Sequence, residues 1–149
     1  MTAVKEVMSK KFYVMSSKKN VEDAARLMVE KDVPCVLVSV DELIVGIVTE
    51  RDIVRKIVAE GFRAKDVLLE NIMTTPLITV QANATIEEAS RLMITYNVRR
   101  LPVMQDDQMI GLVTATEIAA TCAREVNYSD LRLNALARVP KEQLPPSYG

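Results

Sequence analysis

The chain has 149 residues and a net charge of −1, from 19 Lys and Arg against 20 Asp and Glu, and it contains no histidine. This length fits about one domain, or two very small domains that share a core. Hydrophobic residues make up 49% and charged residues 26%, which is typical of a globular protein and excludes disorder for most of the chain. The charge balance argues against a broad basic surface for nucleic acid. The lack of histidine excludes Ser-His and Cys-His nucleophiles and histidine metal ligands.

The two cysteines are too few for a disulfide framework. Cys35 lies in the apolar run 33–38, so we expect it to be a small buried hydrophobic residue. No apolar run approaches the ~18–20 residues of a membrane span, and the N-terminal segment lacks the apolar stretch of a signal peptide. These features favour a cytoplasmic protein.

The sequence contains an internal repeat with an offset of 65 residues. Residues 7–54 align with residues 72–119 without a gap, and 13 of the 48 aligned positions are identical. The identities fall at matching landmarks, such as Leu27 with Leu92, Gly46 with Gly111 and Thr49 with Thr114. We therefore expect a first repeat at residues 5–58, a linker at 59–71, a second repeat at 72–124 and a C-terminal extension at 125–149.

Each repeat shows the same order of expected elements. A short strand (12–15 or 77–80) precedes an amphipathic helix with the N-cap candidates Asn20 and Thr85. Two apolar runs joined by an acidic turn at 41–42 or 106–108 then predict a β-hairpin. A second helix begins after Thr49 or Thr114. The fold class is therefore α+β, with two β-α-β-β-α repeats packed sheet to sheet around a pseudo-twofold axis, because one three-stranded sheet cannot bury both faces alone.

The repeated motifs resemble a pair of cystathionine-β-synthase (CBS) domains, also called a Bateman module. The motifs that carry this resemblance are Val7-Met8, Ile72-Met73-Thr74-Thr75-Pro76, Val98-Arg99-Arg100-Leu101-Pro102-Val103, Gly46-Ile47-Val48-Thr49-Glu50-Arg51-Asp52 and Gly111-Leu112-Val113-Thr114. The resemblance covers roughly residues 5–122. It implies a regulatory, energy-sensing protein that binds AMP, ADP, ATP or S-adenosylmethionine between the repeats, dimerises, and needs no cofactor.

The pattern Gly-x-x-Thr-x-x-Asp at 46–52 has a chemistry of its own. A helix that begins directly after a strand presents unpaired N–H groups, which suits a phosphate. The Thr49 hydroxyl could donate to a phosphate oxygen, and Asp52 could accept from ribose hydroxyls. However, Thr-x-x-Asp is also an ordinary capping box. We expect Asp52 to bend back to the cap less well than the longer Glu117, which favours Asp52 as the ribose acceptor.

Basic residues near this motif have two interpretations each. Arg51, Arg55 and Lys56 could neutralise phosphates or simply form a solvated helix face. Arg99 could contact a phosphate or form a surface ion pair. No cluster of side chains suggests a metal site, and the acidic pair at 106–107 is a poor one without phosphate.

By the family's crossed arrangement, we expect two unequal clefts. The better cleft combines both repeats and would consist of Thr49, Arg51, Asp52, Met73, Pro76, Ile78, Val98 and Arg99. The weaker cleft would consist of Met8, Lys11, Tyr13, Val33, Thr114 and Glu117. The weaker one has lysine in place of proline at 11 and a bulky tyrosine at 13.

We therefore expect a non-enzymatic regulator that binds an adenosine ligand and signals its occupancy to a protein partner. The first alternative is a dimerisation or protein-interaction module with empty clefts, and nucleic-acid binding is a weaker one. An enzyme is disfavoured because no histidine, P-loop or metal cluster is present. A homodimer is expected because the second helix of each repeat has more apolar residues, such as Val54 and Val58, than one sheet can cover.

Overall fold

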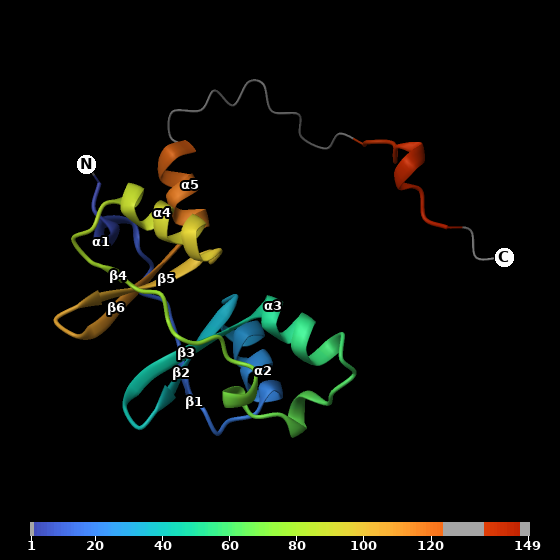
Figure 1. Ribbon diagram of the computed structural model, residues 1–149, viewed down its shortest axis with the longest axis horizontal. Helices are drawn as coiled ribbons and strands as arrows, with labels where there is room; N and C mark the ends of the chain where they lie inside the picture. Colours follow the sequence, from blue (N-terminus) through green and yellow to red (C-terminus); the bar gives the residue numbers. More distant parts are fainter. Residues whose placement is uncertain (1, 124–135, 147–149) are drawn as a thin grey trace.

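The computed structural model describes residues 2–123 and 136–146, which form two similar α/β units (Figure 1). The first unit contains a three-stranded sheet with the order β1-β2-β3, in which β1 is parallel and β3 antiparallel to β2. Its elements are β1 (Val14–Ser16), α2 (Val21–Lys31), β2 (Cys35–Val40), β3 (Leu43–Thr49) and α3 (Glu50–Ile53), which continues as a π-helical turn (Val54–Val58).

The second unit repeats this topology with the sheet order β4-β5-β6. Even the irregularity of the hairpin is repeated, since the register shifts between Val38 and Ser39 in one sheet and between Val103 and Met104 in the other. The elements are β4 (Val80–Gln81), α4 (Ile86–Tyr96), β5 (Arg100–Gln105), β6 (Gln108–Thr114) and α5 (Ala115–Cys122). The predicted α+β fold with two repeats is thereby confirmed.

Both amphipathic helices begin where the sequence predicts. The Asn20 side chain accepts a hydrogen bond from the backbone N–H of Asp23 at 2.8 Å. Thr85 forms a reciprocal capping box with Glu88. Both helices end in a residue with left-handed backbone, Asp32 (φ 53°) and Asn97 (φ 53°), which are side chains that tolerate this conformation. Local capping therefore fixes the lengths of α2 and α4.

The core of each unit includes a residue from the segment that precedes the other repeat in the sequence. Val4, in the short helix α1 (Val4–Val7), is fully buried in the core of the second unit. Its counterpart 65 residues later, Leu69, is fully buried in the core of the first unit, in a short 3-10 turn (Leu69–Asn71). Another 3-10 turn (Ala64–Asp66) packs on α2. The segment 59–71 thus contributes to a core in addition to connecting the repeats, and the predicted domain boundaries stay a prediction.

The crossing of these segments makes β1 and β4 shorter than predicted. Before β1, Ser9 pairs with Leu112 of the second unit, and before β4, Thr74 pairs with Ile47 of the first unit. Because the chain bonds to the opposite repeat first, only its last residues reach the parallel partner. The strands expected at 12–15 and 77–80 are therefore found at 14–16 and 80–81.

The C-terminal extension is described only at residues 136–146, which are exposed and include a 3-10 turn (Lys141–Gln143). The remainder of the extension predicted at 125–149 lies outside the described residues.

Candidate functional site

A cavity of about 210 Å³, which we call cavity A, lies between the two repeats. The end of β3 and the start of α3 form one wall, and the turn from α4 into β5 forms the other. Its lining consists of Ile47, Thr49, Arg51, Asp52, Thr74, Asn97, Val98, Arg99 and Arg100. Five residues of the better predicted cleft, namely Thr49, Arg51, Asp52, Val98 and Arg99, are thus brought to one cavity from both repeats.

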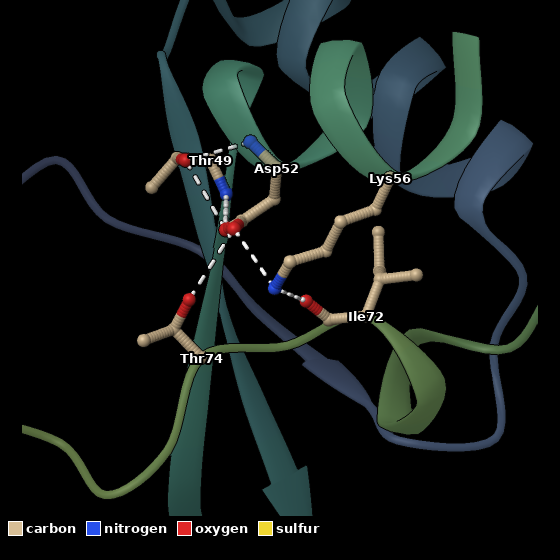
Figure 2. Close-up of polar contacts among 5 residues, drawn as sticks. All are labelled: Thr49, Asp52, Lys56, Ile72 and Thr74. Carbon is tan, nitrogen blue, oxygen red and sulfur yellow. Dashed lines mark hydrogen bonds and ion pairs between the residues drawn. The ribbon is translucent and has the colours of Figure 1, made fainter. Parts of the chain in front are cut away.

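The carboxylate of Asp52 is the centre of a polar network at this cavity (Figure 2). One oxygen, Oδ2, accepts from the backbone N–H of Thr49 at 2.9 Å and lies 3.1 Å from its hydroxyl. The other, Oδ1, accepts from the Thr74 hydroxyl at 3.3 Å and lies 3.2 Å from the Lys56 ammonium. In the other direction, the N–H of Asp52 donates to the Thr49 hydroxyl at 3.2 Å. Asp52 is 9% exposed, so this network largely replaces its hydration.

The expectation that Asp52 bends back poorly to the cap was wrong. Thr49 and Asp52 form a complete capping box, and so do Thr114 and Glu117, because each carboxylate accepts from the backbone N–H of its threonine. Both threonines have an extended backbone, Thr49 with φ −111° and ψ 167° and Thr114 with φ −119° and ψ 163°, which is the usual conformation of an N-cap residue. Asp52 therefore caps α3 and lines cavity A at the same time.

The partners of Asp52 limit what it can accept. A carboxylate has about four acceptor positions, and the two oxygens already have four contacts. The longest hydrogen bond of the four comes from Thr74, at 3.3 Å. A ribose hydroxyl at Oδ1 would therefore displace the Thr74 hydroxyl, the partner with the weakest geometry.

Lys56 is an exposed residue, as a solvated helix face requires, but its ammonium group also has two partners within the protein. Its ammonium group lies 3.2 Å from Asp52 and donates to the carbonyl oxygen of Ile72 at 2.7 Å. The side chain thereby joins the π-helical turn (Val54–Val58) to the segment that enters the second repeat (Figure 2). Lys56 therefore neutralises Asp52 and contacts the backbone of Ile72, and it is not among the residues that line cavity A.

Three predicted members of the better cleft do not line cavity A. Met73 lies against Gly46, where an added Cβ would be 2.8 Å from the Met73 sulfur, and it packs on the first core. Ile78 packs on the second core. Pro76 is exposed on the crossing segment. The crossing of this segment to the opposite repeat, which spacing alone does not indicate, explains why these side chains are turned elsewhere.

Four lining residues escaped prediction: Ile47, Thr74, Asn97 and Arg100. Thr74 and Arg100 lie directly beside the predicted Met73 and Arg99 in the sequence, so they belong to the same motifs. Asn97 reaches the cavity because the left-handed turn that ends α4 places it at the rim. The sequence feature that indicates Asn97 is its position in the short turn between the helix and the strand of the second repeat.

A second cavity of about 250 Å³, which we call cavity B, adjoins the first. It is lined by Pro34, Arg99, Arg100, Thr114, Ala115 and Thr116. Of the weaker predicted cleft, only Thr114 lines this cavity. Among the others, Met8 lies against Gly111, Val33 and Tyr13 belong to the first core, Lys11 is exposed, and Glu117 caps α5.

Cys35, at the start of β2, is 3% exposed, which confirms the predicted buried position. Burial raises the pKa of its thiol to about 11, although the nearby charge of Arg100 acts in the opposite direction. The thiol is therefore protonated and unreactive near neutral pH. Cys122 is exposed.

Within residues 2–123 and 136–146, no three or more cysteine, aspartate or glutamate side chains gather as a metal site. In the same part of the chain, every helix is too short or too polar to cross a bilayer.

Comparison with known proteins agrees with this architecture. A family model for the CBS domain matches residues 4–59 and again residues 65–123. An uncharacterised protein of Methanocaldococcus jannaschii is 35% identical over 129 residues, which cover 80% of this chain and 69% of that protein. The structure of a protein with CBS domains from Burkholderia ambifaria superposes with a TM-score of 0.81 at 29% identity, covering 87% of this chain and all of the other.

A further similar structure contains adenosine compounds. It is the CBS domain pair of protein MJ0100 in complex with 5′-methylthioadenosine and S-adenosyl-L-methionine. It is 25% identical, with a TM-score of 0.76, and the alignment covers 85% of this chain and 99% of that one.

Proposed function

Because the chain belongs to the family of CBS-domain proteins, we propose that it is a non-enzymatic regulator that binds an adenosine ligand in cavity A and signals its occupancy to a partner. CBS-domain pairs are regulatory and signal-transduction modules, which supports the general class. The observation that carries the proposal is the composition of cavity A, whose walls come from both repeats. A ligand there would link the two repeats, so its binding can alter their arrangement.

The lining offers a separate role for each part of an adenosine ligand. Ile47 and Val98 supply apolar surface for the base. Asp52 can accept from a ribose hydroxyl once the hydrogen bond from the Thr74 hydroxyl is broken. Arg51 and Arg99 supply positive charge for an anionic group. This division matches an amphiphilic ligand with an apolar ring at one end and polar groups at the other.

Thermal unfolding with AMP, ADP, ATP and S-adenosylmethionine tests this proposal. A ligand at 100 times its Kd stabilises the native state by about 2.7 kcal/mol, which raises the Tm of a chain of this size by several degrees. Mass spectrometry of small molecules released from the native protein would identify a ligand that copurifies. If none of the four compounds shifts the Tm and none copurifies, the proposal is wrong.

A matched pair of variants separates ligand binding from helix capping. Asp52→Asn and Glu117→Gln each keep an amide oxygen for the capping N–H and remove one charge at equivalent positions of the two repeats. Only Asp52 lines cavity A. We expect Asp52→Asn to weaken adenosine-ligand binding about tenfold or more, and Glu117→Gln to leave it unchanged.

A second function is favoured by the exposed apolar side chains of α2 and the π-helical turn. Val29, Val54 and Val58 are 83%, 57% and 68% exposed. Val29 and Val54 also line an apolar groove of about 340 Å³. Such a surface supports the proposal that the chain forms a homodimer, and in the alternative function this interface alone would be the biological role, with both cavities empty.

A further inference from the structure

A groove of about 360 Å³, which we call the hairpin groove, lies between the two hairpins, whose tips are on the same side of the molecule (Figure 1). One repeat contributes the turn before β3 and the start of that strand, and the other contributes β5, the start of β6 and the segment before β4. Most of the lining is apolar and consists of Leu43, Ile44, Leu77, Pro102, Met104 and Met109. Leu43 is 71% exposed, so much of this apolar surface is uncovered in the part of the chain that the structure describes.

The rim of the hairpin groove is acidic. Glu42 and Asp107 line the groove, and Asp41 and Asp106 lie in the same two turns. Within residues 2–123 and 136–146, none of these four carboxylates forms an ion pair, and no basic residue lines the groove. The groove therefore suits a segment that combines apolar with basic side chains.

The described part of the C-terminal extension, residues 136–146, has this complementary chemistry. Its apolar residues Leu136, Val139 and Leu144 are 100%, 55% and 57% exposed. Arg138 and Lys141 lie between them in the sequence, and neither forms an ion pair within the described ranges of the chain. The segment also contains three prolines, which restrict its backbone and so reduce the conformational entropy that it loses on docking.

The segment 136–146 can reach the surface of its own chain. In the structure it extends away from both units (Figure 1). The 12 residues 124–135 separate it from Ala123, and 12 residues can span up to about 40 Å. A compact domain of about 120 residues has a radius of gyration of only about 14 Å. A short connection also gives a tethered segment an effective concentration in the millimolar range, which favours docking within one chain over docking between chains at micromolar concentration.

We propose that the hairpin groove binds the segment 136–146 of the same chain, with the apolar side chains of the segment in the groove and its two basic side chains at the acidic turns. Because the groove has walls from both repeats, the docked segment holds the two hairpins together. The apolar groove beside Val29 and Val54 is a less suitable site, although Asp32 and Glu50 line it. Basic residues follow each element of that groove closely in sequence, whereas the two hairpin turns contain none.

Tryptophan fluorescence of the full chain tests this docking. The chain contains no tryptophan, so Leu144→Trp introduces a single reporter, and Val139→Trp provides a second one in a separate protein. We expect a blue-shifted emission and a quenching by acrylamide that is about twofold or more weaker than for the same protein in urea. The emission should not depend on protein concentration, because the segment and the groove belong to one chain.

Charge reversal at the rim of the groove identifies the binding site. In the reporter protein, Glu42→Lys should lower the ratio of docked to free segment about two- to fivefold, and Lys141→Glu in the same protein should restore it. Glu60→Lys is the matched control, because it makes the same change at an exposed residue that does not line the hairpin groove. It should leave the emission unchanged.

Three results would overturn the inference. The first is a tryptophan that is as exposed as in urea at both reporter positions. The second is protection that Val54→Glu removes and Glu42→Lys does not, which would place the segment in the groove beside Val29. The third is protection that increases with protein concentration, which would show that a second copy of the chain provides the segment.

Discussion

Two glycines at equivalent positions allow the crossing segments to approach the sheets, and they provide a test of the packing around the site. A Cβ added at Gly111 would meet the Met8 side chain, with Cγ at 2.9 Å, and the backbone oxygen of Ser9 at 3.0 Å. A Cβ added at Gly46 would have only atoms of the Met73 side chain as its three nearest neighbours, from 2.8 to 3.2 Å. We therefore expect Gly111→Ala to destabilise the protein more than Gly46→Ala.

The size of each destabilisation depends on whether the atoms beside the added Cβ can move away. Ser9 is fixed by two backbone hydrogen bonds with Leu112, of 2.8 and 2.9 Å. Moving it strains two bonds that each contribute about 0.5–1.5 kcal/mol, and overpacking itself costs about 1–3 kcal/mol. We expect Gly111→Ala to lower the free energy of unfolding by about 2–4 kcal/mol. For Gly46→Ala we expect about 1 kcal/mol, because a methionine side chain can change rotamer.

Urea unfolding followed by circular dichroism measures both values, provided that the slope with urea is unchanged. The double variant Met8→Ala/Gly111→Ala removes the side-chain part of the clash but keeps the Ser9 oxygen. We therefore expect a favourable coupling between the two substitutions and an incomplete rescue. The argument is refuted if Gly46→Ala is as destabilising as Gly111→Ala, or if the coupling is absent.

Three further predictions concern a thiol, a surface and an ion pair. The pKa of the Cys35 thiol is raised to about 11 from an ordinary 9.0, so the unfolded chain loses this proton first as pH rises. The protonated thiol therefore contributes about 2–3 kcal/mol to the free energy of unfolding below pH 9, and this contribution is lost between about pH 9 and 11. Cys35→Ala should flatten that part of the stability–pH profile, and an unchanged profile would contradict the assignment. Val54→Glu should convert a dimer to a monomer in light scattering, while Leu43→Glu, at an even more exposed hairpin residue, should not. A wild type that is already monomeric would refute the dimer. Lys56→Met should lower the free energy of unfolding by less than about 1 kcal/mol, because the Lys56 side chain is 43% exposed and its ion pair with Asp52 is therefore weak. The loss should be smaller still in high salt. A larger loss that does not depend on salt would contradict this and show that the hydrogen bond to the Ile72 carbonyl dominates.

The fold could be predicted because the information for it is local and occurs twice. Asn20 and Thr85 are side chains that cap helices wherever they precede an amphipathic pattern, and both do so here. Alternating apolar runs around the acidic turns fix the hairpins, and Asp41 and Asp106 adopt the positive φ that these turns require. The α+β class follows from these elements alone.

The lining of the site could be predicted only in part, because it depends on where the chain crosses between the repeats. Local periodicity does not show that Ser9 bonds to Leu112, or that Thr74 bonds to Ile47. These contacts turn Met73 toward Gly46 and bring Thr74 to Asp52. Residues held by their own helix start, such as Thr49, line cavity A as expected, whereas the residues expected from the crossing segment do not.

The difference in lining between the two cavities can be traced to the same internal repeat. Duplication supplies two equivalent helix starts, and both keep their capping boxes because each helix needs one. No such need constrains Arg99 and Arg100, which line both cavities; of their counterparts 65 residues earlier, Pro34 lines cavity B and Cys35 is buried. Because Arg99 and Arg100 line both cavities, a substitution at either residue changes the lining of the two cavities together. The two cavities therefore have different linings although the helix starts beside them are equivalent.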